Sequence, residues 1–370
     1  MTFNNTTTVL KQKKIVFIHG LNDYGGTSLI VSGVIQGLTN LGYQTEVYTA
    51  DSDTPGFLSH LDHVKVYHYK YRKEHFRFFK IFNLLFSQIT IFFRLLKYRR
   101  QNVIFYVNTI IPFGAALSGF VMRKWVIYHV HEISVQNKLI YGICKRIANF
   151  CADDVIYVSN FMRKTKEIKG VRQYVVRNSL SPEFIEHTIP KKQCDVFTVL
   201  MICNLAVYKG VIEFVQVARL LPQYRFELVV SATDDEINAF FKHIRFSENL
   251  IVHGFQSNVH RFYARANLVL NLSHPDKWLE SFGMTILEAM HYELPVIVPP
   301  RGGISELVID DFNGYHIAYN DTDHLVATII SIADNPELYL RLSNGSKEME
   351  KKYNYQEMIT SIDSIIRQVN

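Results

Sequence analysis

Hydrophobic residues follow two alternating patterns along the first half of the chain: short continuous apolar runs, and longer stretches with an apolar residue every three or four positions. Residues 13–20 form such a run and end in glycine, as a buried parallel strand does. Residues 27–41 have helical spacing, and Gly42 behind them is a typical C-terminal stop signal. Further strands are predicted at residues 45–49, 103–107, 125–128 and 155–158. Strands that alternate with helices predict a parallel sheet covered by helices.

The same alternation restarts in the second half, after the polar break Pro190-Lys191-Lys192-Gln193. Strands are predicted at residues 196–201, 226–230, 250–252, 268–272 and 295–298, and helices at residues 211–221, 258–264 and 284–291. We therefore predict an α/β protein with two domains, residues 1–189 and 190–370, and a last helix at about 356–369 that packs across their junction. Two such halves normally place a ligand in the cleft between them, outside the carboxyl ends of the strands.

The composition excludes several classes of protein. With 48% hydrophobic and 20% charged residues, the bulk of the chain is neither disordered nor fibrous. The four cysteines include no CxxC pair and no cysteine–histidine cluster with zinc-ligand spacing, so we expect reduced thiols in a cytoplasmic protein. Residues 1–10 are polar and lack the charged start and apolar core of a signal peptide.

Charge is distributed unevenly between the two halves. Residues 1–190 carry 24 Lys and Arg against 12 Asp and Glu, whereas residues 191–370 carry 16 basic residues against 22 acidic ones. A basic half joined to an acidic half indicates two domains with different partners. The basic half could face nucleic acid or an anionic membrane surface.

Residues 69–100 hold much of this basic charge. They contain nine Lys and Arg against one acid, Glu74, and seven phenylalanines lie between the basic residues. The apolar stretch 81–93 is shorter than the roughly 20 residues that span a bilayer. A basic, aromatic helix in an anionic membrane interface and a core helix with a solvated basic rim both stay open. A nucleic-acid groove is disfavoured, because no recognition-module signature accompanies the segment.

The most specific chemistry lies in residues 273–306. Gly283 lets the backbone approach a ligand closely, and a helix that starts near Met284 would point free N–H groups at an anion such as phosphate. Glu280 precedes this helix and can reach hydroxyl groups of whatever the phosphate carries. Glu288, one turn into the helix, can accept the paired hydroxyls of a ribose. Two glutamates on an ordinary amphipathic helix would have the same spacing, so the spacing alone is weak evidence.

Further residues turn this pattern into a family resemblance. The run Glu280-Ser-Phe-Gly-Met-Thr-Ile-Leu-Glu288-Ala-Met, followed by Pro295-Val-Ile-Val and Gly302-Gly303-x-x-Glu306, resembles the donor site of retaining glycosyltransferases of family 4, the group 1 glycosyltransferases. Matching positions recur in the family's order along the chain: Gly25-Gly26, His131-Glu132, Asn178-Ser-Leu with Phe184, Lys209-Gly210, Gly254-Phe255 with Tyr263, and Asn313-Gly314-Tyr315. The resemblance implies the GT-B fold: two Rossmann-like domains facing across a cleft, with a C-terminal helix that crosses back to the first.

The resemblance also assigns roles to particular residues. It implies three catalytic residues: Lys209 on the diphosphate, Glu280 on the donor-sugar hydroxyls, and His131 on the donor sugar from the acceptor domain. Glu288 resembles the glutamate that binds the nucleotide ribose. The full implied donor-binding set is Gly25, Gly26, Asn204, Lys209, Gly254, Phe255, Phe282, Gly283, Met284, Thr285 and Glu288.

One position departs from the family pattern. The family usually has an arginine five residues before the lysine, but this chain has Asn204 there. An amide donates hydrogen bonds without bringing charge. Either another cation, of which Arg301 is a candidate, compensates for the lost charge, or the donor diphosphate is held more weakly.

The resemblance implies a retaining, metal-independent glycosyltransferase without a cofactor. It would move a sugar from a nucleotide diphosphate-sugar to a hydroxyl of a glycan, and we expect a lipid-linked glycan because the basic segment 69–100 lies in the acceptor domain. The expected setting is bacterial lipopolysaccharide, O-antigen or capsule synthesis, with the enzyme peripheral on the cytoplasmic face of the plasma membrane and without a nucleic-acid partner. A sugar-nucleotide epimerase of the same fold and a catalytically silent binding partner are the alternatives.

Other candidate motifs favour structural roles. Asp51-Ser-Asp53 has the D-x-D form of metal-dependent glycosyltransferases, but behind a predicted strand it is more typical of a turn or a helix N-cap. Asp321-Thr-Asp323 is similar. No GxGxxG follows the first strand, which disfavours a nicotinamide dehydrogenase.

Overall fold

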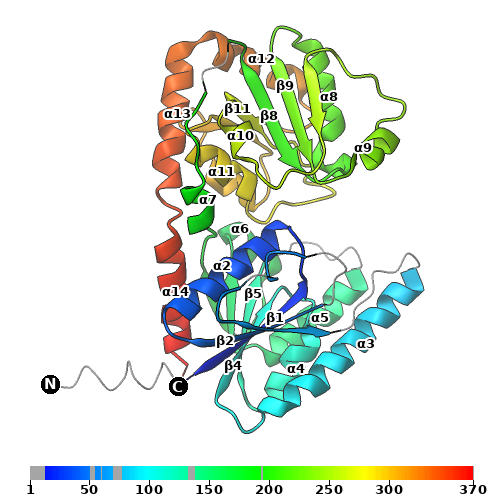
Figure 1. Ribbon diagram of the computed structural model, residues 1–370, viewed down its shortest axis with the longest axis vertical. Coiled ribbons are helices and arrows are strands. Elements are labelled where there is room, and N and C mark those ends of the chain that lie inside the picture. The colour runs from blue at the N-terminus through cyan, green and yellow to red at the C-terminus, as the bar shows by residue number, and fades with distance from the viewer. Residues whose placement is uncertain are drawn as a thin grey trace, which may run out of the picture. The chain divides into compact units, whose positions relative to one another are not determined.

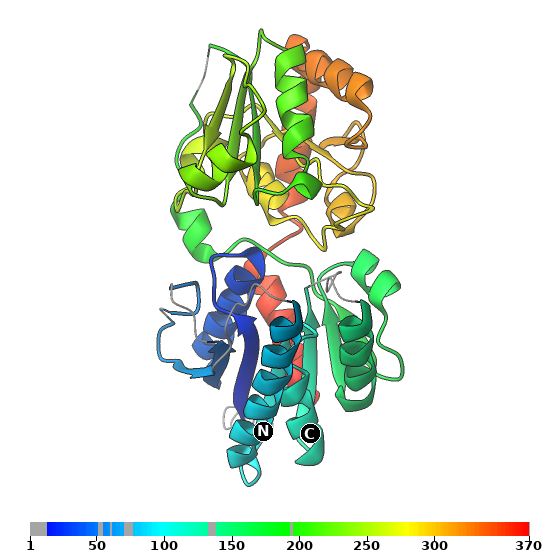
Figure 2. The ribbon, with the colours of Figure 1, turned by 90° about the vertical axis from the view of Figure 1, so that its right-hand side faces the viewer.

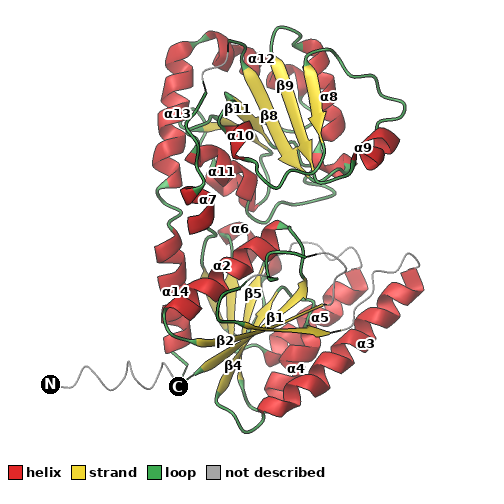
Figure 3. Cartoon of the chain, viewed as in Figure 1, coloured by secondary structure: helices red, strands yellow, loops and turns green. Residues whose placement is uncertain are grey.

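Two parallel β-sheets form the centres of two separate units (Figures 1 and 3). The first unit comprises Met1–Arg177 together with Gln356–Asn370, and the second comprises Asn178–Tyr355. The computed structural model describes residues 13–50, 55–59, 61–69, 77–131, 138–192 and 195–369. The predicted α/β class with two parallel-sheet domains is confirmed, and each unit is described by itself below.

The sheet of the first unit has seven parallel strands in the order β3-β2-β1-β4-β5-β6-β7. Its strands are β1 (Lys14–Leu21), β2 (Gln44–Ala50), β3 (Lys65–Tyr69), β4 (Val103–Asn108), β5 (Trp125–Val130), β6 (Asp154–Tyr157) and β7 (Arg172–Val175). The central strand β1 is a continuous apolar run with Ile15, Val16, Phe17 and Ile18 fully buried, because helices cover both faces of a parallel sheet.

The helices of this unit occupy the connections between the strands, and one comes from the far end of the chain. They are α2 (Gly26–Asn40), α3 (Arg77–Leu95) with the short 3₁₀ turn η1 (Leu96–Tyr98), α4 (Phe113–Val121), α5 (Lys138–Cys151), α6 (Asn160–Lys166) and α14 (Tyr355–Arg367). The apolar face of α14 is buried, and Tyr43 donates a hydrogen bond of 2.7 Å to Asp363 on it. The last helix therefore packs in the first unit, as predicted.

The second unit has a six-stranded parallel sheet in the order β10-β9-β8-β11-β12-β13. Its strands are β8 (Thr198–Cys203), β9 (Arg225–Val230), β10 (Leu250–His253), β11 (Leu268–Leu270), β12 (Val296–Val298) and β13 (Gly314–His316). Its helices are α7 (Pro182–Glu186), η2 (Val207–Lys209), α8 (Val211–Leu220), α9 (Asp234–Phe240), α10 (His260–Tyr263), α11 (Met284–His291), η3 (Gly303–Leu307), α12 (Thr322–Asp334) and α13 (Pro336–Glu350). Phe214 and Phe226 pack edge to face in its core, and both are fully buried.

The division between the units lies before the predicted boundary at residues 189 and 190. Residues 178–189 belong to the second unit, because Phe184 of α7 packs on His260 with ring centroids 4.3 Å apart. The backbone N–H of Ile189 also donates to the hydroxyl of Tyr292. The polar break near residue 190 therefore lies inside the second unit rather than at its start.

Candidate functional site

A largely buried ion pair lies in the second unit, at the carboxyl ends of two neighbouring strands. Lys209, in η2 after β8, places its Nζ 2.6 Å from Oε1 of Glu280, which follows β11 in sequence. The two side chains are only 11% and 16% exposed. Ser273 donates a further hydrogen bond of 2.8 Å to the same carboxylate oxygen. In open α/β sheets this edge is where ligands bind.

The surroundings keep Glu280 ionised. Burial alone would raise the pKa of this carboxyl group, but the attraction and hydrogen bond of Lys209, with the hydrogen bond from Ser273, hold its pKa below its ordinary value. Lys209 and Glu280 therefore form a charged pair. A ligand that binds here can place an anionic group on the ammonium group of Lys209 and hydroxyl groups on the carboxylate of Glu280.

Glycine permits the close approach of the two loops. Gly210, directly after Lys209, has φ +79°, and a Cβ added to it would lie 2.3 Å from the carbonyl oxygen of Leu272. The backbone N–H of His274 donates to the carbonyl of Tyr208 at 2.9 Å. Together these contacts fasten residues 273–280 against η2, so that Glu280 meets Lys209.

Two aromatic rings flank the ion pair, and neither was among the predicted site residues. The rings of Tyr208 and Trp278 are stacked with centroids 5.2 Å apart and planes 22° apart. Nζ of Lys209 lies 5.0 Å from the centre of the Trp278 ring, which is within cation–π range. Trp278 lies two residues before Glu280 in the loop and is one of only two tryptophans in the chain, which is the one sequence signal that could have drawn attention to it.

The helix α11 follows the same loop and supplies the second predicted glutamate. Its N-cap, Gly283, has φ +114° and no side-chain cap, so the first turn of the helix offers backbone N–H groups to an anion. Glu288 in the second turn is buried and accepts a 2.7 Å hydrogen bond from the hydroxyl of Tyr263 in α10. The structure thus gives Glu288 an orienting partner, Tyr263. The family resemblance included Tyr263 but assigned it no role.

Burial raises the pKa of Glu288 to about 7, although the hydrogen bond from Tyr263 acts in the opposite direction. Without a ligand, this carboxyl group is therefore partly protonated near neutral pH. Ligand hydroxyls that donate to it would favour the ionised form, so binding of such a ligand is coupled to release of a proton.

Replacing Gly283 by alanine is expected to destabilise the second unit by at least about 2 kcal/mol. The φ of +114° disfavours any side chain, and the new Cβ would lie 2.5 Å from Cγ1 of Ile304. Urea unfolding followed by circular dichroism measures the loss. Gly142→Ala in α5 is the matched control, because a Cβ there meets nothing within 4 Å. Equal unfolding midpoints for the two variants would contradict the expectation.

The other predicted donor residues of the second unit lie in loops at the same edge of the sheet, except Met284 and Thr285, which form the start of α11. Phe255 is 51% exposed, its N–H donates to the carbonyl of Ala232, and Gly254 before it follows β10. Phe282 is instead buried and contacts the ring of Tyr353, so its side chain supports the loop, and only its backbone is available to a ligand.

The residue that replaces the family's arginine and the cation proposed to compensate for it are both at the surface. Asn204, directly after β8, and Arg301 are exposed. The backbone beside Arg301 lies against the site, because the N–H of Gly303 donates to the carbonyl of Glu280 at 2.7 Å. Arg301 therefore belongs to a loop that contacts Glu280, and its compensating role stays a prediction.

The predicted site residues of the first unit lie at the carboxyl edge of that unit's own sheet. Gly25 is the N-cap of α2, ahead of Gly26, and its N–H donates to Asp23. His131 follows β5 and is buried, and its ring lies against that of His129, with centroids 4.0 Å apart and planes 46° apart. Burial, with the nearby histidines, holds the pKa of His131 well below its ordinary value, so the imidazole is neutral. Glu132, Asp51 and Asp53 lie outside the described residues.

Within the described ranges, no three His, Cys, Asp or Glu side chains are grouped so that they could hold a metal ion. Asp321, in the second D-x-D sequence, is the N-cap of α12 and accepts from the backbone N–H of His324. The structural interpretation of Asp321-Thr-Asp323 is therefore confirmed.

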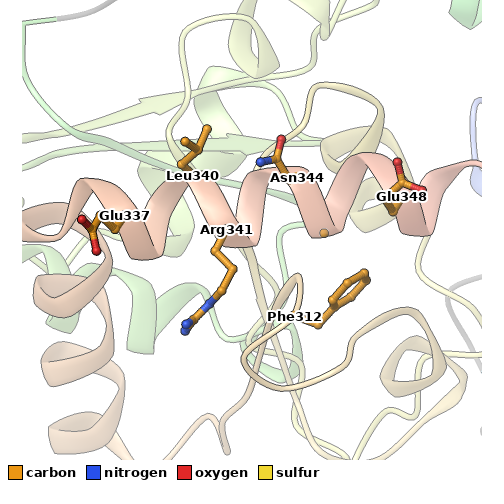
Figure 4. Close-up of a pocket in the computed structure, with 7 residues that line it drawn as sticks. Phe312, Glu337, Leu340, Arg341, Asn344 and Glu348 are labelled. Carbon is orange, nitrogen blue, oxygen red and sulfur yellow. The ribbon is translucent and has the colours of Figure 1, made fainter.

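A shallow cavity of about 490 Å³ lies elsewhere in the second unit, along α13 (Figure 4). Phe312 and Leu340 line it together with Arg341 and the carboxylates Glu337 and Glu348. None of the predicted donor-binding residues lines it, and we assign the chemistry to the loops around the Lys209–Glu280 pair instead.

Comparison with known proteins shows what the second unit and the whole fold are similar to. The sequence profile of the family described as "Glycosyl transferases group 1" matches residues 184–349. An uncharacterized glycosyltransferase of Haemophilus influenzae is 20% identical over 96% of this chain and all of that protein. The N-acetyl-alpha-D-glucosaminyl L-malate synthase of Bacillus anthracis is 24% identical over 70% of this chain and 62% of that enzyme. An uncharacterized glycosyltransferase of Methanocaldococcus jannaschii is 31% identical over a match that covers 25% of this chain and 26% of that protein.

Solved structures share the fold over nearly the whole chain. The complex of Anabaena HepE with UDP-glucose has a TM-score of 0.76 at 19% identity, covering 96% of this chain and 100% of that one. The lipopolysaccharide outer core galactosyltransferase WaaB has a TM-score of 0.69 at 17% identity, covering 95% and 99%. Residues 184–349 therefore resemble the glycosyl transferases group 1 family, and the two-unit α/β architecture is the fold of the GT-B glycosyltransferases.

Proposed function

We propose that this protein transfers a sugar from a nucleotide diphosphate-sugar to a hydroxyl group of a glycan. The observation that carries the proposal is the pairing of Lys209 with Glu280 beside the uncapped N-terminus of α11. It provides a cation, free backbone N–H groups and a carboxylate acceptor, the three features that a sugar diphosphate requires. The solved complex of HepE with UDP-glucose supports a nucleotide sugar as the donor.

Each group has a distinct task in this proposal. Lys209 and the N–H groups of α11 stabilise the negative charge that grows on the diphosphate as the glycosidic bond breaks. Glu280 accepts hydrogen bonds from sugar hydroxyls once Lys209 turns to the phosphates. Glu288, oriented by Tyr263, accepts the ribose hydroxyls. The resemblance also assigns His131 of the first unit to the donor sugar, and its neutral imidazole suits hydrogen bonding to a hydroxyl.

We further propose that transfer proceeds with retention and without a metal ion. Of the two glutamates in the site, Glu280 is assigned to the sugar hydroxyls and Glu288 to the ribose, so neither is left as a nucleophile; this favours attack on the same face with help from the leaving phosphate. Lys209 and the helix amides would do what a divalent ion does in other transferases. We expect turnover to be unchanged in EDTA. Loss of activity in EDTA with recovery in manganese would contradict the metal-free mechanism, and a trapped glycosyl-enzyme would contradict same-face attack.

One screen tests the transfer itself. The protein is incubated with a panel of UDP-, GDP- and dTDP-sugars, and nucleotide release is followed with and without glycan acceptors. Release that depends on the acceptor is the expected result. Conversion of a donor to its epimer without an acceptor would establish an epimerase instead. Donor binding without release or conversion would indicate a silent binding partner.

The acceptor we propose is a lipid-linked glycan of a bacterial surface polysaccharide, such as an O-antigen or capsule precursor. The similarity to WaaB, which is a lipopolysaccharide outer core galactosyltransferase, supports this class of acceptor. The excess of Lys and Arg in residues 1–190 would suit an acceptor carried on a lipid diphosphate. Such an enzyme would work at the cytoplasmic face of the plasma membrane.

A further inference from the structure

The outward face of α3 in the first unit is apolar. Its exposed side chains recur every three or four residues and are 48% to 65% exposed: Phe82, Leu85, Phe86, Ile89 and Phe93. A solvated helix face normally carries polar residues, so this stripe is the reverse of the pattern of an ordinary surface helix. The structure thus decides against a core helix with a solvated basic rim, because the outward face itself is hydrophobic.

The opposite face of α3 is fixed to its own unit. Gln88 is buried and its Oε1 accepts from the N–H of Gly114 in α4 at 3.0 Å. A Cβ on Gly114 would lie 2.1 Å from the carbonyl oxygen of Gln88, so the two helix backbones are in close contact. Arg94 also donates to the carbonyl of His68, at the end of β3, at 2.6 Å. The C-terminal half of the helix is therefore docked on its own unit.

These contacts bear on how α3 could meet a membrane. Among the described residues, the segment Ile81–Tyr98 is long and apolar enough to cross a bilayer by length and composition, and 28% of it is buried. This segment is longer than the apolar stretch 81–93, which by itself is too short to cross a bilayer. Crossing would break the contacts of Gln88, Gly114 and Arg94, whereas lying parallel to a surface keeps them all.

The apolar face continues over the two neighbouring helices. In α4, Phe120 and Val121 are 44% and 63% exposed, and in α5, Leu139, Ile143 and Phe150 are 43% to 73% exposed. The rings of Phe120 and Phe150 join the two helices, with centroids 4.4 Å apart. Figures 1 and 2 both show α3, α4 and α5 side by side. Right-handed crossovers place these helices on the same side of the sheet.

The charge around this face has one sign. In the sequence, Glu132 is the only acidic residue between Glu74 and Asp153. Basic residues with described side chains on and beside the three helices include Arg94, Lys97, Arg99, Arg100, Arg123, Lys124, Lys145 and Arg146. A second copy of the chain on this face would bring these cations close to one another, which disfavours a self-complementary dimer. An anionic lipid surface complements both the charge and the apolar side chains.

We propose that α3, α4 and α5 form a docking surface for an anionic bilayer, on which the first unit rests with these apolar side chains in the lipid interface. The surface reaches well beyond residues 69–100, because α4 and α5 contribute half of its exposed apolar side chains. The proposal rests on and deepens the proposed lipid-linked acceptor. Vesicle binding is measured without donor or acceptor, so its failure would remove the docking surface and leave the proposed sugar transfer standing.

Flotation of the full chain with vesicles tests the surface. We expect binding to vesicles of phosphatidylglycerol and phosphatidylcholine at low salt, and little binding to phosphatidylcholine alone. Arg99→Gln, Arg100→Gln and Arg123→Gln together should weaken binding about 100-fold, from about fivefold for each lost cation. Phe86→Gln, Ile89→Gln and Phe93→Gln together should weaken it at least as much, since all three side chains are already exposed and their loss leaves the fold intact.

Matched variants of the second unit serve as controls. Lys242→Gln, Arg245→Gln and Lys352→Gln remove three exposed cations, and Leu220→Gln with Leu340→Gln removes two exposed apolar side chains. Both sets should bind vesicles as the unaltered chain does, and circular dichroism should show that every variant is folded. The proposal is overturned if the α3 variants bind as the controls do, or if light scattering shows a dimer that the α3 variants dissociate.

Discussion

Replacing Lys209 by methionine is expected to slow sugar transfer by a factor of about 100 to 1,000, the usual cost of removing one group that stabilises developing negative charge. The ammonium group is the one cation that the described structure places against Glu280, and the family position that normally adds an arginine holds Asn204. Because position 204 supplies no second cation for the leaving diphosphate, the variant should lower the turnover rate more than the affinity for the donor. Steady-state kinetics with the donor identified by the screen gives the measurement.

The same variant should also lose stability, because it leaves the carboxylate of Glu280 buried without its partner. Breaking such a pair costs about 3–5 kcal/mol. The double variant Lys209→Met with Glu280→Gln removes both charges and should regain most of the stability but none of the activity. If the double variant recovered turnover as well, the loss in Lys209→Met would be one of folding, and Lys209 would have no part in transfer.

Replacing Glu288 by glutamine is expected to weaken nucleotide binding by about 1–3 kcal/mol while raising the stability of the ligand-free protein above pH 7. Burial raises the pKa of Glu288 from its ordinary 4.5 to about 7, so the folded state binds this proton more tightly than the unfolded state. The stability contributed by the protonated group is therefore complete below pH 4.5 and is lost as the pH rises to about 7. The loss amounts to about 3 kcal/mol, and glutamine does not incur it.

Urea unfolding from pH 5 to pH 8 measures the stability, and calorimetry with the nucleotide diphosphate measures binding. The unaltered chain should lose stability over this range relative to Glu288→Gln, and Glu337→Gln, an exposed glutamate on α13, should follow the unaltered chain. Parallel stability curves for Glu288→Gln and the unaltered chain would show that Glu288 is ionised without strain. Unchanged nucleotide affinity would remove it from the ribose site.

The sheets were predictable where their strands are continuously apolar, and less so at their edges, where only β10 was among the predicted strands. The strands β3, β7 and β13 were missed, and each lies at the end of its sheet. They are short and half-exposed, with polar residues among the apolar ones, as in Arg172–Val175. A strand paired on one side only needs no long apolar run, so its pattern does not differ from that of a loop.

The candidate site was predictable where its residues are close in sequence. Glu280, Gly283 and Glu288 share one loop and one helix, and together with the family resemblance of this stretch they indicate an anion site. The ion pair of Glu280 with Lys209 joins residues 71 positions apart, and the bond of Glu288 with Tyr263 joins residues 25 apart. Such pairings depend on the order of the strands, which brings β8 beside β11, and no local pattern encodes that order.

The return of the chain to the first unit has a practical consequence for how the protein can be divided. The second unit is inserted between Met1–Arg177 and Gln356–Asn370, so a truncated chain that ends at residue 355 would damage the first unit rather than the second. Lys13 donates through its Nζ to the carbonyl of Val369, so the two pieces of the first unit meet near these residues. A circular permutant that joins them there and opens the chain between the units would make each unit a continuous sequence. Lipid binding and nucleotide binding could then be assigned to separately produced halves.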